Sequence, residues 1–316
     1  MSSTRSGLLF VSLAGVLWGT GGLALEILRD HAQLSVLTVS AYRMAVAAVV
    51  LVAASFVVRR GPQLAALVRL HPVRATAVGL GTAAYQALYF GSVATAGVTV
   101  ATVVSLGLAP VLLAVVDLVR SRTTARDGAR LRPTPAGGRT VRLPLVLTSA
   151  LTGLVLVSIA SGSGGVGTRP VVGLLLAVAS GSVYAGTTAL GSTVLASDGV
   201  EPLALTTVAT TAGAVGLVPA ALVAGGPYVT ADPVALGTLA YLGVLTMAVA
   251  YGLFYAGLRT TCSGSAVVAT LLEPVTAAVA AAVVLGERLG SAGVVGSVLI
   301  LAAVAGLDER TGERPA

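Results

Sequence analysis

One acidic side chain stands inside a long apolar stretch. Glu273 lies in LLEPVTAAVAAAVVLG, residues 271–286, which contains no other charge. A carboxylate at the centre of a membrane-spanning helix costs roughly 2.5–3.5 kcal/mol on insertion scales, so a role or a partner must offset it. Because burial favours the neutral form, Glu273 could exchange a proton for a substrate amine. The alternative is a neutral or paired carboxyl that bonds a neighbouring helix, near a backbone carbonyl freed by Pro274.

A basic side chain occupies a similar apolar setting. Arg43 lies a little outside the centre of the apolar segment 35–58. Its guanidinium cannot be deprotonated, so it needs a carboxylate, backbone carbonyls or water. Arg43 could hold a substrate carboxylate or pair with Glu273. It could equally form a fixed lock between helices or extend toward the membrane surface.

Aromatic side chains recur at helical spacing. Tyr85 and Tyr89 are four residues apart, as are Tyr251 and Tyr255, so each pair shares a helix face. Gln86 adds an uncharged donor and acceptor. The set predicted to line an amphipathic cavity that accepts a cation over aromatic rings consists of Trp18, Tyr85, Gln86, Tyr89, Tyr184 and Tyr251. Aromatic residues also form belts at the membrane interface, a role that suits Tyr228 and Tyr255.

Two prolines interrupt apolar segments at corresponding positions. Pro110 and Pro274 each remove a backbone donor, which kinks or softens a helix. These prolines are either hinges or sites of a static kink.

The elements that must position these residues are membrane helices. Hydrophobic residues make up 56% of the 316-residue chain and charged residues 10%, with a mean hydropathy of +0.96. A spanning helix needs roughly 20 apolar residues. Charge clusters and Gly/Pro turns divide the chain into ten predicted spanning helices, near 7–28, 35–58, 75–95, 99–119, 143–161, 170–195, 203–224, 234–257, 263–285 and 291–307.

The basic residues indicate orientation rather than nucleic-acid binding. All 19 are arginines, and seven of them lie between Arg120 and Arg142. With alternating loops, most arginines fall on the side of the N-terminus, so the positive-inside rule places both termini in the cytoplasm. The segment 120–142 is predicted to be a cytoplasmic loop that touches anionic lipid.

The sequence does not contain the residues that a disulfide-linked, metal-binding, ATP-driven or catalytic protein would require. Cys262 is the only cysteine, and His31 and His71 are the only histidines, so no disulfide framework or Cys/His metal site is expected. No ATP-binding loop of the G-x-x-x-x-G-K-[ST] type is present. No nucleophile with a base is visible for an intramembrane enzyme. We expect no cofactor and no catalytic activity.

The two halves of the chain resemble each other. A shift of 166 residues aligns Gly15 with Gly181, Trp18 with Tyr184, and Tyr85 with Tyr251, while Pro110 aligns with Pro274 after a two-residue slip. Equivalent helices are five crossings apart, so the halves are predicted to be inverted in the membrane. Inverted halves provide two related conformations open to opposite sides, which is the basis of alternating access.

The stretch LLEPVTAAVAAAVVLGERLG (271–290) resembles the second repeat of the EamA branch of the drug/metabolite transporter superfamily. The segments LWGTGG (17–22), AYR (41–43) and YQALYFGSVATAGVTVATVVSLGLAPV (85–111) resemble its first repeat. This resemblance implies an all-α membrane fold of ten helices in two inverted five-helix repeats, here 7–161 and 168–307. It also implies a central cavity and the efflux or exchange of metabolites, amino acids or drugs.

Together these patterns predict a secondary transporter in the cell membrane, a proton-coupled exporter of a small metabolite, amino acid or drug. The alternatives are a lipid or lipid-carrier flippase on the same fold or an intramembrane enzyme. Expected partners are a small-molecule substrate, protons and membrane lipid, with a homodimer left open.

Overall fold

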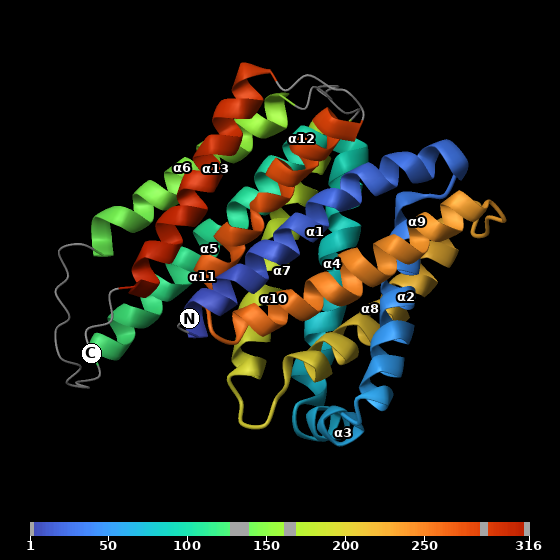
Figure 1. Ribbon diagram of the computed structural model, residues 1–316, viewed down its shortest axis with the longest axis horizontal. Helices are drawn as coiled ribbons and strands as arrows, with labels where there is room; N and C mark the ends of the chain where they lie inside the picture. The colour runs from blue at the N-terminus through green and yellow to red at the C-terminus, as the bar shows by residue number, and fades with distance from the viewer. Residues whose placement is uncertain (1–2, 127–138, 161–168, 285–289, 313–316) are drawn as a thin grey trace.

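Apolar helices dominate the computed structural model, which describes residues 3–126, 139–160, 169–284 and 290–312 (Figure 1). Every regular element within these stretches is a helix. The first half contains α1 (Ser3–His31), α2 (Val36–Val57), α3 (Gly61–Leu70), α4 (Pro72–Ala96), α5 (Val98–Arg126) and α6 (Arg139–Ala160). The second half contains α7 (Pro170–Leu195), α8 (Pro202–Ala224), α9 (Pro233–Gly243), the π-helical turn η1 (Val244–Val249), α10 (Ala250–Leu258), α11 (Ser263–Thr270), α12 (Leu272–Val284) and α13 (Ser291–Gly312).

Six helical stretches of the described chain are long and apolar enough to cross a bilayer. They comprise Arg5–His31, Val36–Val57, Pro170–Leu195, Pro202–Ala224, Pro233–Leu258 and Ser263–Val284. Shorter apolar stretches are Val100–Val116, Pro144–Ala160 and Ser291–Ala305.

The structure departs from the predicted boundaries at three places. Residues 58–74 were predicted to be a loop but include the short helix α3. The predicted loop 120–142 is shorter, because α5 continues to Arg126 and α6 begins at Arg139; the rest of that loop lies outside the described residues. The predicted helix 263–285 is broken at Leu271. The Glu287–Arg288 part of the family-like stretch also lies outside the described residues.

Helices from the two halves pack against each other. The helix α1 packs on α10, α11 and α12, while α7 packs on α4 and α5. Two further pairs flank this centre: α6 lies beside α13, and α2 lies beside α8 on the opposite side of the molecule (Figure 1). The centre of the bundle is therefore built from both halves of the chain.

The α6–α13 pair depends on two facing glycines. A Cβ on Gly153 would lie 2.6 Å from the carbonyl oxygen of Gly296, and a Cβ on Gly296 would lie 2.7 Å from that of Gly153. In lipid there is little hydrophobic drive between helices, so association relies on such close backbone packing. Neither position has room for a side chain.

A polar anchor joins the end of α1 to the start of α9. Asp232 accepts a hydrogen bond from the Ala235 amide at 2.8 Å and lies 3.3 Å from Nδ1 of His31. The Ala235 amide first, and then His31, hold the pKa of the Asp232 carboxyl below its ordinary value. This anchor therefore stabilises the fold above the ordinary pKa of aspartate and weakens as the pH falls through the lowered value.

We predict that Gly153→Val destabilises the protein in detergent by about 1–3 kcal/mol, because the added methyl groups overpack the α6–α13 contact. The measurement is the unfolding midpoint, followed by the fluorescence of Trp18, the only tryptophan of the chain. Gly237→Val is the matched control, because a Cβ at Gly237 meets no atom within 4 Å. Equal midpoints for the two variants would contradict this account.

Candidate functional site

A cavity of about 320 Å³ lies among α1, α2, α4, α7, α10 and α12. All eight residues predicted to bind substrate or couple ions line it: Trp18, Arg43, Tyr85, Gln86, Tyr89, Tyr184, Tyr251 and Glu273. The cavity extends to Arg29 and Val36 near the ends of α1 and α2. Its lining is mainly aromatic and apolar, with three charged side chains in its wall: Arg43 and Glu273 in the middle, and Arg29 at the end of α1.

Glu273 lies in the first turn of α12, directly after the helix break. Pro274 has no N–H to bond the carbonyl of Thr270 four residues earlier, so the helix tightens and the Leu271 amide bonds Val268 at 3.1 Å instead. The helix dipole favours negative charge in the first turn of a helix, where Glu273 lies. Sequence reasoning placed Glu273 and Pro274 inside a continuous helix. That prediction is wrong, because the helix is interrupted at Leu271. Glu273 therefore lies at the N-terminus of a new helix, α12.

Helix α1 approaches this break closely. A Cβ on Gly19 would collide with the carbonyl of Glu273 and would lie 2.5 Å from Cβ of Thr276. One turn earlier, a Cβ on Gly15 would lie 3.1 Å from the carbonyl oxygen of Thr270, the residue whose usual donor Pro274 removes. These contacts fix the broken segment against α1 and set the height of Glu273 in the cavity.

Arg43 is held by a hydroxyl on the irregular turn η1. Its Nη2 donates to Oγ1 of Thr246 at 3.2 Å. The Thr246 hydroxyl donates in turn to the Leu242 carbonyl at 2.6 Å, so its lone pairs are left for Arg43. The Ala250 amide bonds the Leu245 carbonyl five residues back, a π-helical step that often occurs at functional sites.

Glu273 and Arg43 face one cavity without forming an ion pair. Within the described part of the chain, no salt bridge joins Glu273 to Arg43. The guanidinium of Arg43 instead donates a hydrogen bond to Thr246. Several buried polar atoms at the cavity also have no partner: Nε1 of Trp18, Nε of Arg43, and both Oε1 and Nε2 of Gln86. Buried polar atoms are normally satisfied. The wall of this cavity therefore contains buried donors and acceptors that the protein itself does not satisfy.

The aromatic residues form two packed groups across the cavity. The rings of Tyr85 and Tyr184 stack with centroids 4.9 Å apart, and the ring of Trp18 lies 5.0 Å from that of Tyr251. Tyr89 is fixed by a hydrogen bond of 2.8 Å to Thr102. Aromatic faces of this kind suit a planar or cationic group.

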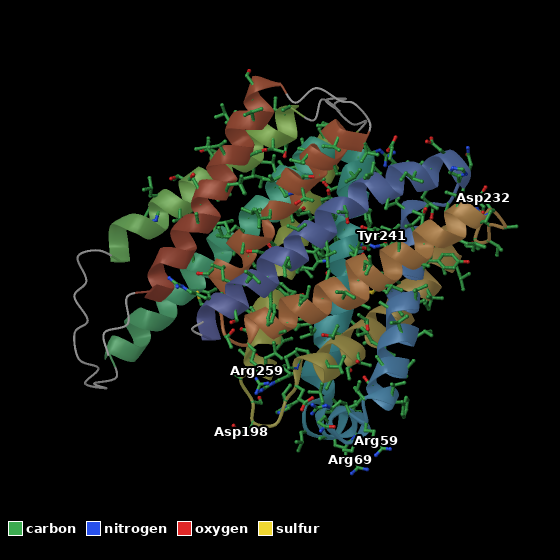
Figure 2. All side chains as sticks on the ribbon, viewed as in Figure 1. Arg59, Arg69, Asp198, Asp232, Tyr241 and Arg259 are labelled. Atoms are coloured by element: carbon green, nitrogen blue, oxygen red, sulfur yellow. The ribbon has the colours of Figure 1, made fainter. Side chains whose placement is uncertain are left out.

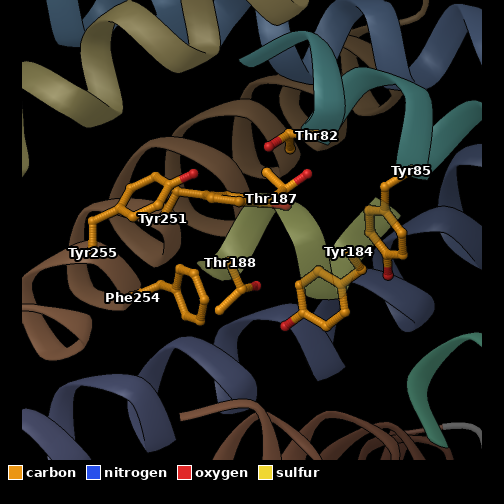
Figure 3. Close-up of a pocket in the computed structure, with 8 residues that line it drawn as sticks. All are labelled: Thr82, Tyr85, Tyr184, Thr187, Thr188, Tyr251, Phe254 and Tyr255. Atoms are coloured by element: carbon orange, nitrogen blue, oxygen red, sulfur yellow. The ribbon is translucent and has the colours of Figure 1, made fainter. Parts of the chain in front are cut away.

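A second, much smaller void adjoins the cavity and shares three tyrosines with it (Figure 3). Its volume is only about 10 Å³, the size of one water. Besides the three cavity tyrosines, it is lined by Thr82, Thr187, Thr188, Phe254 and Tyr255. We call these five residues the tyrosine–threonine neck. Tyr255 is 2% exposed, so the prediction that it belongs to an interfacial belt is wrong.

Some residues in or beside the cavity were not predicted. Thr246, the partner of Arg43, sits in a run of residues whose π-helical turn carries no sequence signal. Gly21 and Gly22 line the cavity beside Trp18, and a Cβ at Gly22 meets no atom within 4 Å. Both glycines belong to the LWGTGG segment (17–22), whose resemblance to the first family repeat could have marked them as candidate lining residues. Pro110 lies inside the unbroken helix α5, whereas Pro274 follows a break.

Comparison with known proteins agrees with this architecture. Residues 5–125 and 171–307 match the EamA-like transporter family. The chain belongs to this family. The EamA chain is 26% identical over 293 residues to the "Uncharacterized transporter YwfM" of Bacillus subtilis (strain 168), covering 93% of this chain and 90% of that protein. A crystal structure of a protein with 20% sequence identity shares the fold at a TM-score of 0.74, over 98% of this chain and 99% of that one.

These findings make the protein an integral membrane transporter of the drug/metabolite superfamily. They do not assign roles to the cavity residues. The participation of the eight residues in substrate binding or coupling therefore stays a prediction, as does hinge motion at Pro110 or Pro274.

We predict that Thr246→Val lowers the free energy of unfolding by about 1–2 kcal/mol, because it removes the acceptor of a charged donor inside the membrane. Thr246→Ser keeps the hydroxyl and should retain most of the stability. In an Arg43→Met background the Thr246→Val change should cost much less. A double-mutant cycle of unfolding midpoints measures this coupling, and additive effects would contradict the assigned bond.

Proposed function

We propose that this EamA protein is a secondary transporter that exports a small metabolite, amino acid or drug across the cell membrane in exchange for protons. The observation that carries the proposal is a cavity lined by aromatic rings, the Glu273 carboxylate and the guanidiniums of Arg43 and Arg29, with several unpartnered polar atoms in its wall. Its volume of about 320 Å³ is at the lower end of the range for small-molecule sites, about 300–1,000 Å³. That size suits a small polar or amphipathic molecule better than a lipid.

We infer ten crossings arranged as two inverted halves, 7–161 and 168–307. The two separate family matches support this division. The packing is also reciprocal: α1 on α10 corresponds to α7 on α4, and α1 on α11 and α12 corresponds to α7 on α5. Trp18 and its equivalent Tyr184 both line the cavity, as do Tyr85 and Tyr251. Such a pair of halves can exchange shapes to open either side.

We assign the end that carries Arg59, Arg69 and Arg259 to the cytoplasm (Figure 2). The start of α1 belongs to this end, because a Cβ on Gly7 would meet the side chains of Thr260 and Thr261. An even number of crossings returns the C-terminus to the same side. The cavity then faces outward past Arg29, and the tyrosine–threonine neck closes the cytoplasmic side.

Proton exchange would use Glu273. In the outward-facing form the carboxylate releases substrate and takes up a proton, and in the inward-facing form it gives up that proton as substrate binds. Thr246 keeps Arg43 from neutralising Glu273 directly, so the carboxylate stays available for a proton or for a cationic substrate group.

The test is substrate-driven proton flux into or out of proteoliposomes that contain a pH-sensitive dye, with a panel of amino acids, amines and drugs. We expect at least one compound to drive flux in the wild type and Glu273→Gln to abolish it while the protein remains folded. Glu26→Gln is the matched control, because Glu26 is exposed and pairs with Arg29 at 3.4 Å. If no compound drives flux but labelled substrate exchanges equally in wild type and Glu273→Gln, proton coupling through Glu273 is wrong.

Gly22 should limit the size of accepted compounds. A leucine at this position would project into the cavity, because nothing occupies the space next to Gly22. We predict that Gly22→Leu lowers the transport of the bulkiest accepted compound by about tenfold or more. The smallest compound should lose much less, and Gly237→Leu should change neither. Relative initial rates for the two compounds measure this effect, and an equal loss for both would contradict it.

A further inference from the structure

The short helix α3 forms an unassigned surface at the basic end of the molecule. It lies crosswise to its neighbours: in Figure 1 it is seen nearly down its axis, whereas α2 and α4 are seen from the side. Leu67 is 2% exposed and fixes one side of α3 to the bundle. Val68 and Leu70, which flank Leu67 on the two sides of the helix, are exposed at 48% and 68%, and Arg69 projects from the side opposite Leu67.

Exposed apolar side chains also lie in the segments directly before and after α3. Phe56 and Val57 at the end of α2 are 68% and 81% exposed, and Val73 at the start of α4 is 78% exposed. These side chains would contact the acyl chains of a bilayer whose surface runs along α3. We call the surface formed by Phe56, Val57, Val68, Leu70 and Val73, together with the arginines below, the α3 surface.

Three arginines border this apolar band with no protein partner. Arg59, Arg69 and Arg74 are exposed, and their side chains form no ion pair or hydrogen bond with the described part of the chain. Arg60 differs, because it pairs with Glu201 at 2.5 Å and joins the start of α3 to that of α8. Three unpaired cations beside exposed apolar side chains complement a membrane surface with anionic headgroups.

The backbone at Arg59 adds an independent observation. Arg59 has φ +56°, the only positive φ at a non-glycine residue in the described chain. Its amide bonds Phe56 at 3.0 Å and the Arg60 amide bonds Ser55 at 2.8 Å, the pattern of a Schellman helix end. Glycine suits this position best, so an arginine here is strained. A strained residue is grounds for a functional hypothesis.

We propose that the α3 surface is a binding site for anionic phospholipid, in which Arg59, Arg69 and Arg74 hold headgroup phosphates and α3 lies in the membrane interface. The left-handed turn at Arg59 directs the chain from α2 into the crosswise α3. This site is separate from the central cavity and does not depend on what the cavity transports.

The test uses Val68→Cys in a Cys262→Ser background, labelled with a fluorophore and reconstituted in phosphatidylcholine vesicles. Spin-labelled phosphatidylglycerol or spin-labelled phosphatidylcholine is titrated at equal mole fractions, and quenching gives the relative affinity of the two lipids. We expect a preference for phosphatidylglycerol that falls about fivefold with each arginine removed by Arg59→Gly, Arg69→Gln or Arg74→Gln. The same label at Leu222→Cys, an exposed position near the other end of α8, should show no preference.

Arg59→Gly separates the effect of the positive φ at this residue on stability from the effect of its side chain on lipid binding. Because glycine relieves the positive φ, this variant should unfold at the same or a higher temperature while it loses lipid preference. Equal quenching by both lipids in the parent protein would overturn the proposal. So would a label at Val68 that neither lipid quenches, since the α3 surface would then face water or another protein. A preference that survives removal of all three arginines would overturn it as well.

Discussion

Close backbone contact between helices is the constraint on which the rest of this structure depends. Within hydrocarbon, apolar side chains gain little by leaving lipid, so helices associate through dispersion and short polar contacts. At Gly19 the backbone of α1 lies so near the Glu273 carbonyl that no Cβ fits. This contact positions the broken segment before α12, and with it the carboxylate in the cavity. At the periphery, Gly153 and Gly296 do the same for α6 and α13.

The cost of charge in a membrane explains the irregular backbone at the cavity. Glu273 stands directly after a helix break, in the first turn of α12, where the helix dipole favours negative charge. Arg43 stands opposite η1, where a π-helical turn accompanies the Thr246 hydroxyl that binds it. Each charge therefore lies beside a local departure from the α-helix, and the two side chains do not form a direct ion pair. Charges held in this way can respond to a proton or a ligand.

The two ends of the molecule differ in their chemistry. One end carries the α3 surface, with Arg59, Arg69 and Arg74 beside exposed apolar side chains. The other is fastened by Asp232 and His31, close to where the cavity approaches Arg29. The tyrosine–threonine neck separates the cavity from the basic end. This asymmetry supports the proposed form, in which the cavity opens toward the end that carries Asp232 and His31.

Length, hydropathy and charge placement determined where most helices lie, because a segment in lipid must satisfy its backbone internally. The same reasoning identified Glu273, Arg43 and the aromatic set, since a charge within an apolar run is costly wherever it packs. Only the tertiary structure revealed that these residues share one cavity. It alone assigned Thr246 to Arg43, buried Tyr255 and broke the helix before Glu273. Those features depend on contacts between helices far apart in the chain, which periodicity and composition do not encode.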